Sequence, residues 1–242
     1  MSLPKFTKTW HSDVYDAINP TRPELSAKGS LVVITGGGSG IGPKIAEAFA
    51  QAHAANIAIL GRTEKTLLST KTFLESKYDA KVHTFVADIS DAAAVNETFK
   101  SISALGHIRF FVNNAGYLPN IGTIKDSDAD EWLQGHEINV KGSFLVTRGF
   151  LRGAASNAVL INVSSAIAHV PAVPGHSAYS VSKLASTKFF EYVQLEHPEI
   201  RVINFHPGVI KTNMAQKAKA QSGIEWPLDK GQSFNFVFDT VC

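Results

Sequence analysis

The chain has 242 residues, of which 44% are hydrophobic and 18% charged, and its 23 basic and 21 acidic side chains leave a formal net charge of +2. This composition excludes a wholly disordered chain and is typical of a globular protein, either one or two domains of about 150 residues or one larger α/β domain. The balanced charge lacks the basic footprint of a nucleic-acid-binding protein, so no nucleic-acid partner is expected. No apolar run approaches the roughly 18 residues of a membrane span, so no membrane partner is expected.

The single cysteine, Cys242, cannot form an internal disulfide, which fits a reducing compartment. The N-terminal residues lack the apolar core of a signal peptide, and they include Asp13 and Asp16, which a transit peptide would avoid. These features favour a cytoplasmic location. The nine histidines show none of the usual metal-ligand spacings, so no metal site is expected.

Residues 1–29 contain three prolines and no sustained periodicity, so they are predicted to form an N-terminal arm. Two interpretations of this arm stay open. It is either a disordered leader or a segment that packs against the body or a partner subunit. The second interpretation is favoured by four large apolar side chains, Phe6, Trp10, Tyr15 and Ile18.

From residue 31 onward, short β-branched runs alternate with longer segments of helical periodicity. The runs lie at 31–35, 56–60, 81–88, 108–113, 158–164 and 201–206. The helical segments lie at 41–53, 64–77, 92–103, 129–153 and 178–196. Most runs are apolar on both faces, as in the strands of a parallel sheet that is covered on both sides. We therefore predict one α/β domain, residues 30–242, with a Rossmann-type, doubly wound parallel sheet of six clear strands flanked by helices.

A glycine-rich turn follows the first predicted strand, with the sequence Thr35-Gly36-Gly37-Gly38-Ser39-Gly40-Ile41-Gly42. Glycines let the backbone approach a pyrophosphate closely, and a helix N-terminus offers unpaired N–H groups with a partial positive charge. A strand precedes this turn and a helix follows it, so a dinucleotide site is favoured over a flexible glycine loop.

This turn resembles the nucleotide-binding signature of the short-chain dehydrogenase/reductase family. Four further motifs resemble the family and follow in its chain order. They are Asn113-Asn114-Ala115-Gly116, Asn162-Val163-Ser164-Ser165, Tyr179-Ser180-Val181-Ser182-Lys183, and Pro207-Gly208 with Thr212 four residues later. The resemblance covers residues 31–212. It implies an oxidoreductase that transfers a hydride between a nicotinamide cofactor and a carbonyl or secondary alcohol group of a small-molecule substrate.

The resemblance also implies a set of cofactor-binding residues. They are Gly36, Ser39, Gly40, Ile41, Gly42, Arg62, Asp88, Asn114, Ala115, Gly116, Tyr179, Lys183, Pro207, Gly208, Ile210 and Thr212. After the second strand of such folds, an acidic residue binds the ribose 2′-hydroxyl of NAD, whereas an Arg accommodates the 2′-phosphate of NADP. Here Gly61 occupies the acidic position and Arg62 follows, so NADP(H) is expected rather than NAD(H).

Two of these assignments have an alternative. Arg62 is either a clamp for the 2′-phosphate, to which Ser39 could add a hydrogen bond, or a solvated residue at a helix start. Asp88 resembles the family's contact to the adenine ring, and it could also cap the helix that starts near Asp91.

Tyr179 and Lys183 are four residues apart on a predicted helix, so they share a face. A nearby ammonium is expected to lower the pKa of a tyrosine from its usual value of about 10. By resemblance, Tyr179 is the general acid of carbonyl reduction, and Lys183 also binds the nicotinamide ribose. Ser165, favoured over Ser164, orients the substrate carbonyl. Asn139 resembles the asparagine that holds a water in a proton relay, or else contributes ordinary helix polarity.

The last part of the chain departs from the family pattern. After Thr212 the resemblance implies a substrate-covering segment at about 213–228, then a helix and a seventh strand, which is not evident before Cys242. An uncovered sheet edge is a liability, so the family's usual homo-oligomer is in doubt. An alternative function is therefore an NADP-binding sensor with little or no activity. The apolar stretch 170–175 either lines the site of a hydrophobic substrate or is a plain connecting loop.

Overall fold

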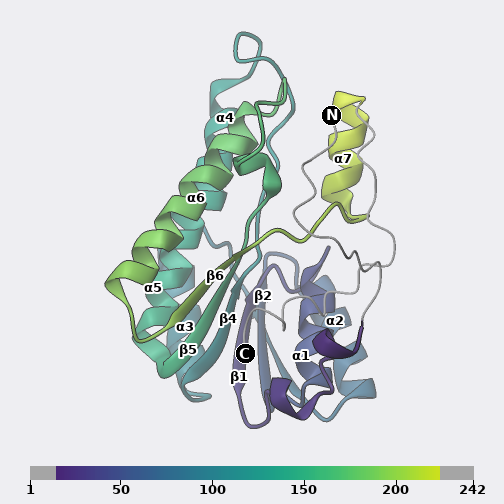
Figure 1. The fold of residues 1–242 in the computed structure, drawn as a ribbon, viewed down its shortest axis with the longest axis vertical. Coiled ribbons are helices and arrows are strands. Elements are labelled where there is room, and N and C mark those ends of the chain that lie inside the picture. The colour runs from purple at the N-terminus through teal and green to yellow at the C-terminus, as the bar shows by residue number, and fades with distance from the viewer. Residues whose placement is uncertain (1–14, 224–242) are drawn as a thin grey trace.

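The computed structural model of the protein describes residues 15–223 (Figure 1). Within them, six parallel strands form one sheet in the order β3-β2-β1-β4-β5-β6. The strands are β1 (Leu31–Thr35), β2 (Asn56–Gly61), β3 (Lys81–Val86), β4 (Ile108–Asn113), β5 (Ala154–Val163) and β6 (Arg201–Phe205). The predicted Rossmann-type doubly wound sheet is thereby confirmed.

The strands are connected by helices at positions close to those predicted. The helices are α1 (Gly42–Gln51), α2 (Glu64–Lys77), α3 (Ala92–Ser103), α4 (Ala129–His136), α5 (Ser143–Gly153), α6 (Ser177–Glu196) and α7 (Asn213–Ser222). The short helical turns are η1 (Asp16–Ile18), η2 (Pro23–Leu25), the π-helix η3 (Glu137–Gly142) and η4 (Ala166–Ala168). None of the helices in the described range is long and apolar enough to cross a membrane.

Several predicted boundaries differ from those in the structure. The segment 129–153 is not one helix, because the π-helix η3 separates α4 from α5. Strand β5 begins at Ala154 rather than at residue 158, because Ala154 pairs with Ile108 across a register shift. Strand β3 ends at Val86 rather than at residue 88, because the chain turns there toward α3.

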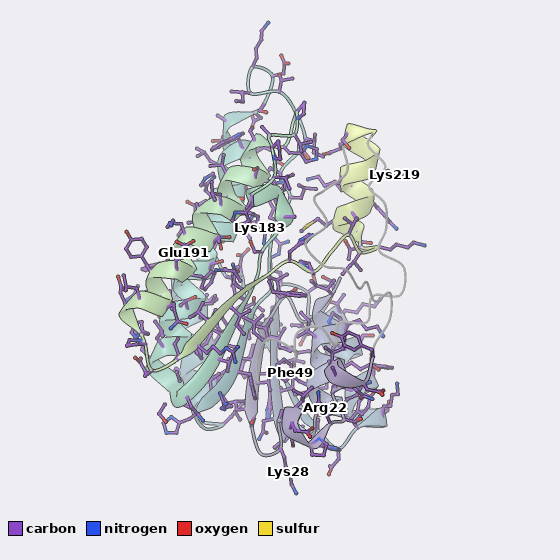
Figure 2. All side chains as sticks on the ribbon, in the orientation of Figure 1. Arg22, Lys28, Phe49, Lys183, Glu191 and Lys219 are labelled. Carbon is purple, nitrogen blue, oxygen red and sulfur yellow. The ribbon has the colours of Figure 1, made fainter. Side chains whose placement is uncertain are left out.

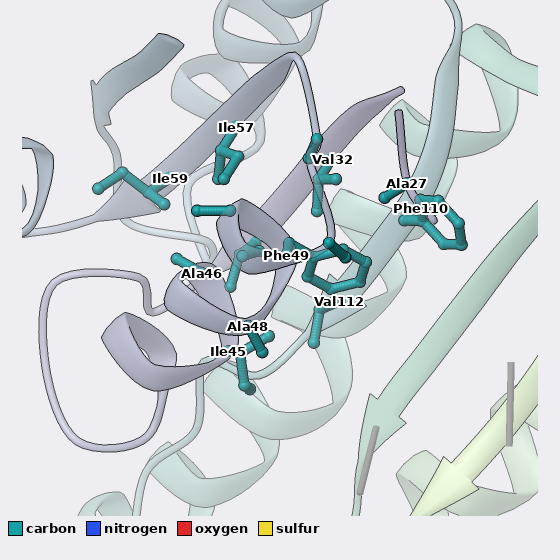
Figure 3. Close-up of a cluster of buried hydrophobic side chains, with 14 of the residues drawn as sticks. Ala27, Val32, Ile45, Ala46, Ala48, Phe49, Ile57, Ile59, Phe110 and Val112 are labelled. Carbon is teal, nitrogen blue, oxygen red and sulfur yellow. The ribbon is translucent and has the colours of Figure 1, made fainter. Parts of the chain in front are cut away.

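The sheet has a separate apolar core on each face, because alternate side chains of a strand point to opposite sides. On one face, Val32 and Ile34 pack with Phe49 of α1. Figure 3 shows Phe49 among the side chains of this core, and its ring centroid lies 5.2 Å from that of Phe110. On the other face, Phe111 stacks on Phe150 of α5, with centroids 5.0 Å apart.

The described part of the N-terminal arm packs against the domain. Ile18, Leu25 and Ala27 are buried. The N–H group of Ala27 donates to the carbonyl oxygen of Ala52 at 2.7 Å, just beyond α1. Packing against the body is thus the correct interpretation for residues 15–29. Phe6 and Trp10 lie outside the described residues, as do residues 224–242, where the incomplete ending was expected.

Candidate active site

The residues of the candidate site gather at the carboxyl ends of the strands. The glycine-rich turn follows β1, Asn114 follows β4, Ser165 follows β5 and Pro207 follows β6. The strand order reverses at β1, which has β2 on one side and β4 on the other. In open α/β sheets, ligands bind in the crevice at such a point, outside the carboxyl ends of the strands.

The glycine-rich turn lies so close to its neighbours that only glycine fits at several positions. A Cβ atom on Gly42 would collide with the carbonyl oxygen of Gly36, and one on Gly36 would lie 2.9 Å from Nδ2 of Asn114. Gly40 has a φ of +61°, and a Cβ atom added to it would lie 3.9 Å from the methyl group of Thr212. The hydrogen bonds of residues 15–223 provide no acceptor for the N–H groups of Ser39, Gly40 and Ile41.

Asn114 holds the turn against the end of β4. Its Nδ2 donates to the carbonyl oxygens of Thr35 and Gly36 at 2.9 and 3.3 Å. The hydroxyl of Thr35 accepts from the N–H groups of Asn114 and Ala115, both at 2.9 Å. Within the described residues, the buried Oδ1 of Asn114 has no hydrogen-bond partner, so it is available as an acceptor.

Arg62 and Asp88 lie together beyond the ends of β2 and β3. The guanidinium of Arg62 is 3.9 Å from the carboxylate of Asp88, and the Arg62 side chain is 66% exposed. The carboxylate of Asp88 accepts hydrogen bonds from the N–H and hydroxyl groups of Ser90 at 2.9 and 2.7 Å. Asp88 does not cap α3, because Asp91 accepts from the first free N–H groups of that helix.

Ser165, Tyr179 and Lys183 come together between β5 and α6. The Ser165 side chain lies close enough to the Tyr179 hydroxyl to lower its pKa, and Nζ of Lys183 lies 5.8 Å from the centroid of the Tyr179 ring. Lys183 lies on α6 (Figure 2). Its side chain is buried, and its Nζ donates to the carbonyl oxygen of Val163 at 2.8 Å. A Cβ on Gly116 would lie 3.6 Å from this Nζ. The competing serine, Ser164, is buried and paired with the Thr187 hydroxyl instead, so the geometry favours Ser165.

The ionisation of this cluster is controlled by burial. Burial raises the pKa of Tyr179 to about 12, although the Ser165 side chain opposes the shift. Burial lowers the pKa of Lys183 to about 8. The pKa of Tyr179 is raised rather than lowered as predicted, because its burial outweighs the effect of the Lys183 ammonium. Tyr179 is thus a protonated acid at neutral pH, as a proton donor must be.

The burial of Lys183 makes folding stability depend on pH. Its pKa rises from about 8 in the folded chain to its ordinary value of 10.5 on unfolding. Between these two pH values the unfolded chain binds more protons than the folded chain, so the free energy of unfolding rises with pH. We expect the free energy of unfolding of the wild type to rise relative to Lys183→Met between pH 7 and 10, by up to about 3 kcal/mol. Denaturant melts at several pH values measure this, and parallel pH profiles for the two proteins would contradict it.

Asn139 lies in the π-helix η3 and is 2% exposed. Its Oδ1 accepts from the N–H group of Tyr117 at 2.8 Å, and its Nδ2 donates to the carbonyl oxygen of Tyr117 at 2.9 Å. The same Nδ2 lies 3.0 Å from the hydroxyl of Ser182 on α6. Asn139 therefore bonds η3 to α6 and to the segment after Gly116. Sequence periodicity did not indicate this bridging role.

A ladder of asparagines fixes the strand ends beneath the site. Asn113 donates to the side-chain oxygen of Asn162, which in turn donates to that of Asn204, both at 2.9 Å. These residues are paired in register across β4, β5 and β6. Asn113 also donates to the hydroxyl of Ser143 at the start of α5. Asn113 and Asn162 lie in two of the family motifs, but those motifs did not indicate that the three side chains bond to one another across the strands.

The segment after β6 returns to the glycine-rich turn. Pro207 is half-buried, Gly208 has a φ of +80°, and Ile210 packs against the core that contains α1. Thr212 caps α7 by accepting from the N–H group of Ala215 at 3.1 Å. The methyl of Thr212 also faces Gly40, so the segment 207–212 lies beside the glycine-rich turn.

Comparisons with known proteins agree with this geometry. The chain matches the short chain dehydrogenase family over residues 30–223. It is 34% identical to the short chain dehydrogenase pigC of Monascus ruber, over 86% of this chain and 71% of that protein. It is 31% identical to a short chain dehydrogenase/reductase of Claviceps purpurea, over 93% and 77% of the two chains.

Solved structures share the fold as well. An alcohol dehydrogenase of Thermococcus sibiricus, complexed with 5-hydroxy-NADP, is 25% identical to this chain. Its TM-score is 0.73, over 78% of this chain and 80% of that one. The oxidoreductase yciK of Escherichia coli has a TM-score of 0.79 at 20% identity, over 87% and 88% of the two chains, and this likeness concerns the fold alone.

Proposed function

Since the chain belongs to the short-chain dehydrogenase/reductase family, we propose that it transfers a hydride between NADP(H) and a carbonyl or secondary alcohol group of a small, hydrophobic substrate. One observation carries this proposal. Ser165, Tyr179 and Lys183 are grouped at the carboxyl edge of the sheet, directly beside Gly116 and the crevice of the glycine-rich turn. We also propose that residues 1–29 form an arm, that residues 30–242 form the oxidoreductase domain, and that the protein is cytoplasmic.

The residues of the crevice fit a nicotinamide dinucleotide. The N–H groups of Ser39, Gly40 and Ile41 lack acceptors within residues 15–223 and so are available to phosphate oxygens at the start of α1. The buried Oδ1 of Asn114 is available to a hydroxyl group. When bound, the cofactor would supply the hydride, and the protein contributes orientation and a proton.

The proposed reduction uses the three grouped side chains in distinct ways. The Ser165 hydroxyl donates a hydrogen bond to the carbonyl oxygen and polarises the carbonyl group. Tyr179 transfers its phenolic proton to the same oxygen as the hydride reaches the carbonyl carbon. The Lys183 ammonium stabilises the phenolate that remains. Oxidation of the alcohol reverses these steps, with Tyr179 as the base.

Arg62 supports NADP(H) over NAD(H) in this proposal. Its exposed guanidinium is only loosely paired with Asp88 at 3.9 Å, so it can turn to a 2′-phosphate and form two charge-assisted hydrogen bonds. Gly61, at the end of β2, provides no carboxylate that would repel the phosphate. The Thermococcus neighbour was solved with an NADP derivative, which points the same way.

The proposed activity is tested by mixing the purified protein with NADPH and a panel of aliphatic and aryl aldehydes and ketones. We expect a loss of reduced-nicotinamide absorbance with at least one hydrophobic carbonyl compound. Tight binding of NADPH without oxidation across the panel would contradict the proposal and favour the sensor alternative.

A further inference from the structure

Within residues 15–223, polar side chains bond helix α7 to the rest of the chain. It has no buried residue, and Figure 1 shows it apart from the helices that cover the sheet. A surface helix without a buried apolar face gains little stability from packing. The side chains that bond α7 to the rest of the chain therefore decide where it lies.

Lys217 makes the first set of these contacts. Its Nζ donates to the carbonyl oxygen of Leu118 at 2.7 Å and lies 3.9 Å from the carboxylate of Glu131. The same ammonium lies 5.0 Å from the centroid of the Tyr117 ring. Lys217 thus bridges α7 to the segment after Gly116 and to α4.

Gln221 makes the second set, one turn further along α7. Its side-chain oxygen accepts from the N–H group of Ile121 at 3.0 Å, and its Nε2 donates to the Asn120 side chain at 3.1 Å. These two bonds satisfy both polar atoms of the Gln221 amide. They fasten the C-terminal half of α7 to the same segment that Lys217 contacts.

That segment, residues 117–122, is itself anchored at both ends. Tyr117 is held by Asn139, and its hydroxyl donates to Glu131 at 2.7 Å. Gly122 donates to the carbonyl oxygen of Gly175 at 3.1 Å. Lys217 and Gln221 therefore bond α7 to a segment that is itself held in place by other hydrogen bonds.

The N-terminal end of α7 reaches the reacting group. The hydroxyl of Tyr179 lies 3.9 Å from the thioether sulfur of Met214. A substrate oxygen must approach this hydroxyl, so the substituents of the substrate must pass or contact Met214. A thioether side chain is flexible and apolar, which suits it to line a pocket for hydrophobic groups.

We propose that Met214 determines the size of the carbonyl substituents that the site accepts, and that Lys217 and Gln221 are positioning residues that hold Met214 beside Tyr179. This inference rests on the proposed function, because it concerns the substrate of that reaction. To the substrate-covering role expected of the segment after Thr212, it adds one side chain that selects by size and two that hold α7 without touching the reacting atoms.

The test is the ratio of kcat/KM for an aryl ketone to that for a small dialkyl ketone. Met214→Ala is expected to raise the ratio about tenfold, because the pocket gains space. Lys217→Met is expected to raise it in the same direction, and to add nothing in the Met214→Ala background. An unchanged ratio in Met214→Ala, or effects that multiply fully in the double variant, would overturn the proposal. The same-helix variant Gln216→Leu should match the wild type.

A second readout does not depend on activity. Hydrogen exchange of the amides in residues 213–222 is expected to be about tenfold faster in Lys217→Met and Gln221→Leu, with α1 unchanged. Unchanged exchange in α7 would overturn the positioning role. If the wild type oxidises no NADPH, the proposed function and the specificity role of Met214 fail together. The exchange rates still decide whether Lys217 and Gln221 hold α7.

Discussion

Tyr179→Phe is expected to lower kcat for carbonyl reduction by about a thousandfold while NADPH affinity stays within about twofold of the wild type. The substitution removes the phenolic proton that Tyr179 transfers to the carbonyl oxygen in the proposed reduction. The phenyl ring keeps the packing of α6, so the nucleotide crevice is undisturbed. Steady-state kinetics give kcat, and a fluorescence titration gives the NADPH affinity.

The matched control for this variant is Tyr192→Phe. Tyr192 lies on the same helix and is 56% exposed, so losing its hydroxyl should change neither quantity. A Tyr179→Phe variant with near wild-type turnover would show that the proton comes from another group. A variant that also loses NADPH binding would show that the Tyr179 hydroxyl is needed to bind the cofactor or to fold the site.

Arg62→Asp is expected to reduce the preference for NADPH over NADH, measured as the ratio of the two kcat/KM values, by about a hundredfold or more. The change removes charge-assisted hydrogen bonds to the 2′-phosphate, each worth roughly a factor of ten or more, and adds a repelling carboxylate. The new carboxylate can also accept from the ribose 2′-hydroxyl of NADH. Steady-state kinetics with both cofactors measure the ratio.

Lys81→Asp is the control for net charge in the Arg62 experiment. Lys81 is exposed at the start of β3, whereas Arg62 follows the end of the neighbouring parallel strand β2. Both substitutions replace a positive charge with a negative one. Its cofactor ratio should stay close to that of the wild type. If Arg62→Asp and Lys81→Asp behave alike, the effect is one of overall charge and Arg62 does not contact the phosphate.

The fold and the grouping of the site could be predicted because both follow from local patterns. Strands that are apolar on both faces indicate a covered parallel sheet. The carboxyl ends of such strands meet at one edge, so the positions of Asn114, Ser165 and Pro207 after their strands already place them together. The buried part of the arm was harder to judge, because Ile18 has no periodic partners in the sequence.

The features that escaped prediction depend on contacts between distant segments. A π-turn differs from an α-turn by one residue, and the 3.6-residue periodicity of 129–153 does not reveal it. The raised pKa of Tyr179 follows from its burial, whereas helical spacing shows only that Tyr179 and Lys183 share a face. Lys217 and Gln221 carry no motif, since their partners lie about a hundred residues earlier.

The most direct test of the proposed hydride transfer uses NADPH that carries deuterium at the transferable position of its nicotinamide ring. The protein is incubated with this cofactor and a hydrophobic ketone, and the alcohol is analysed by mass spectrometry. The expected result is an alcohol with one deuterium on the former carbonyl carbon, formed by the wild type and nearly absent with Tyr179→Phe. Binding of NADPH with no labelled alcohol for any carbonyl compound would contradict the proposal.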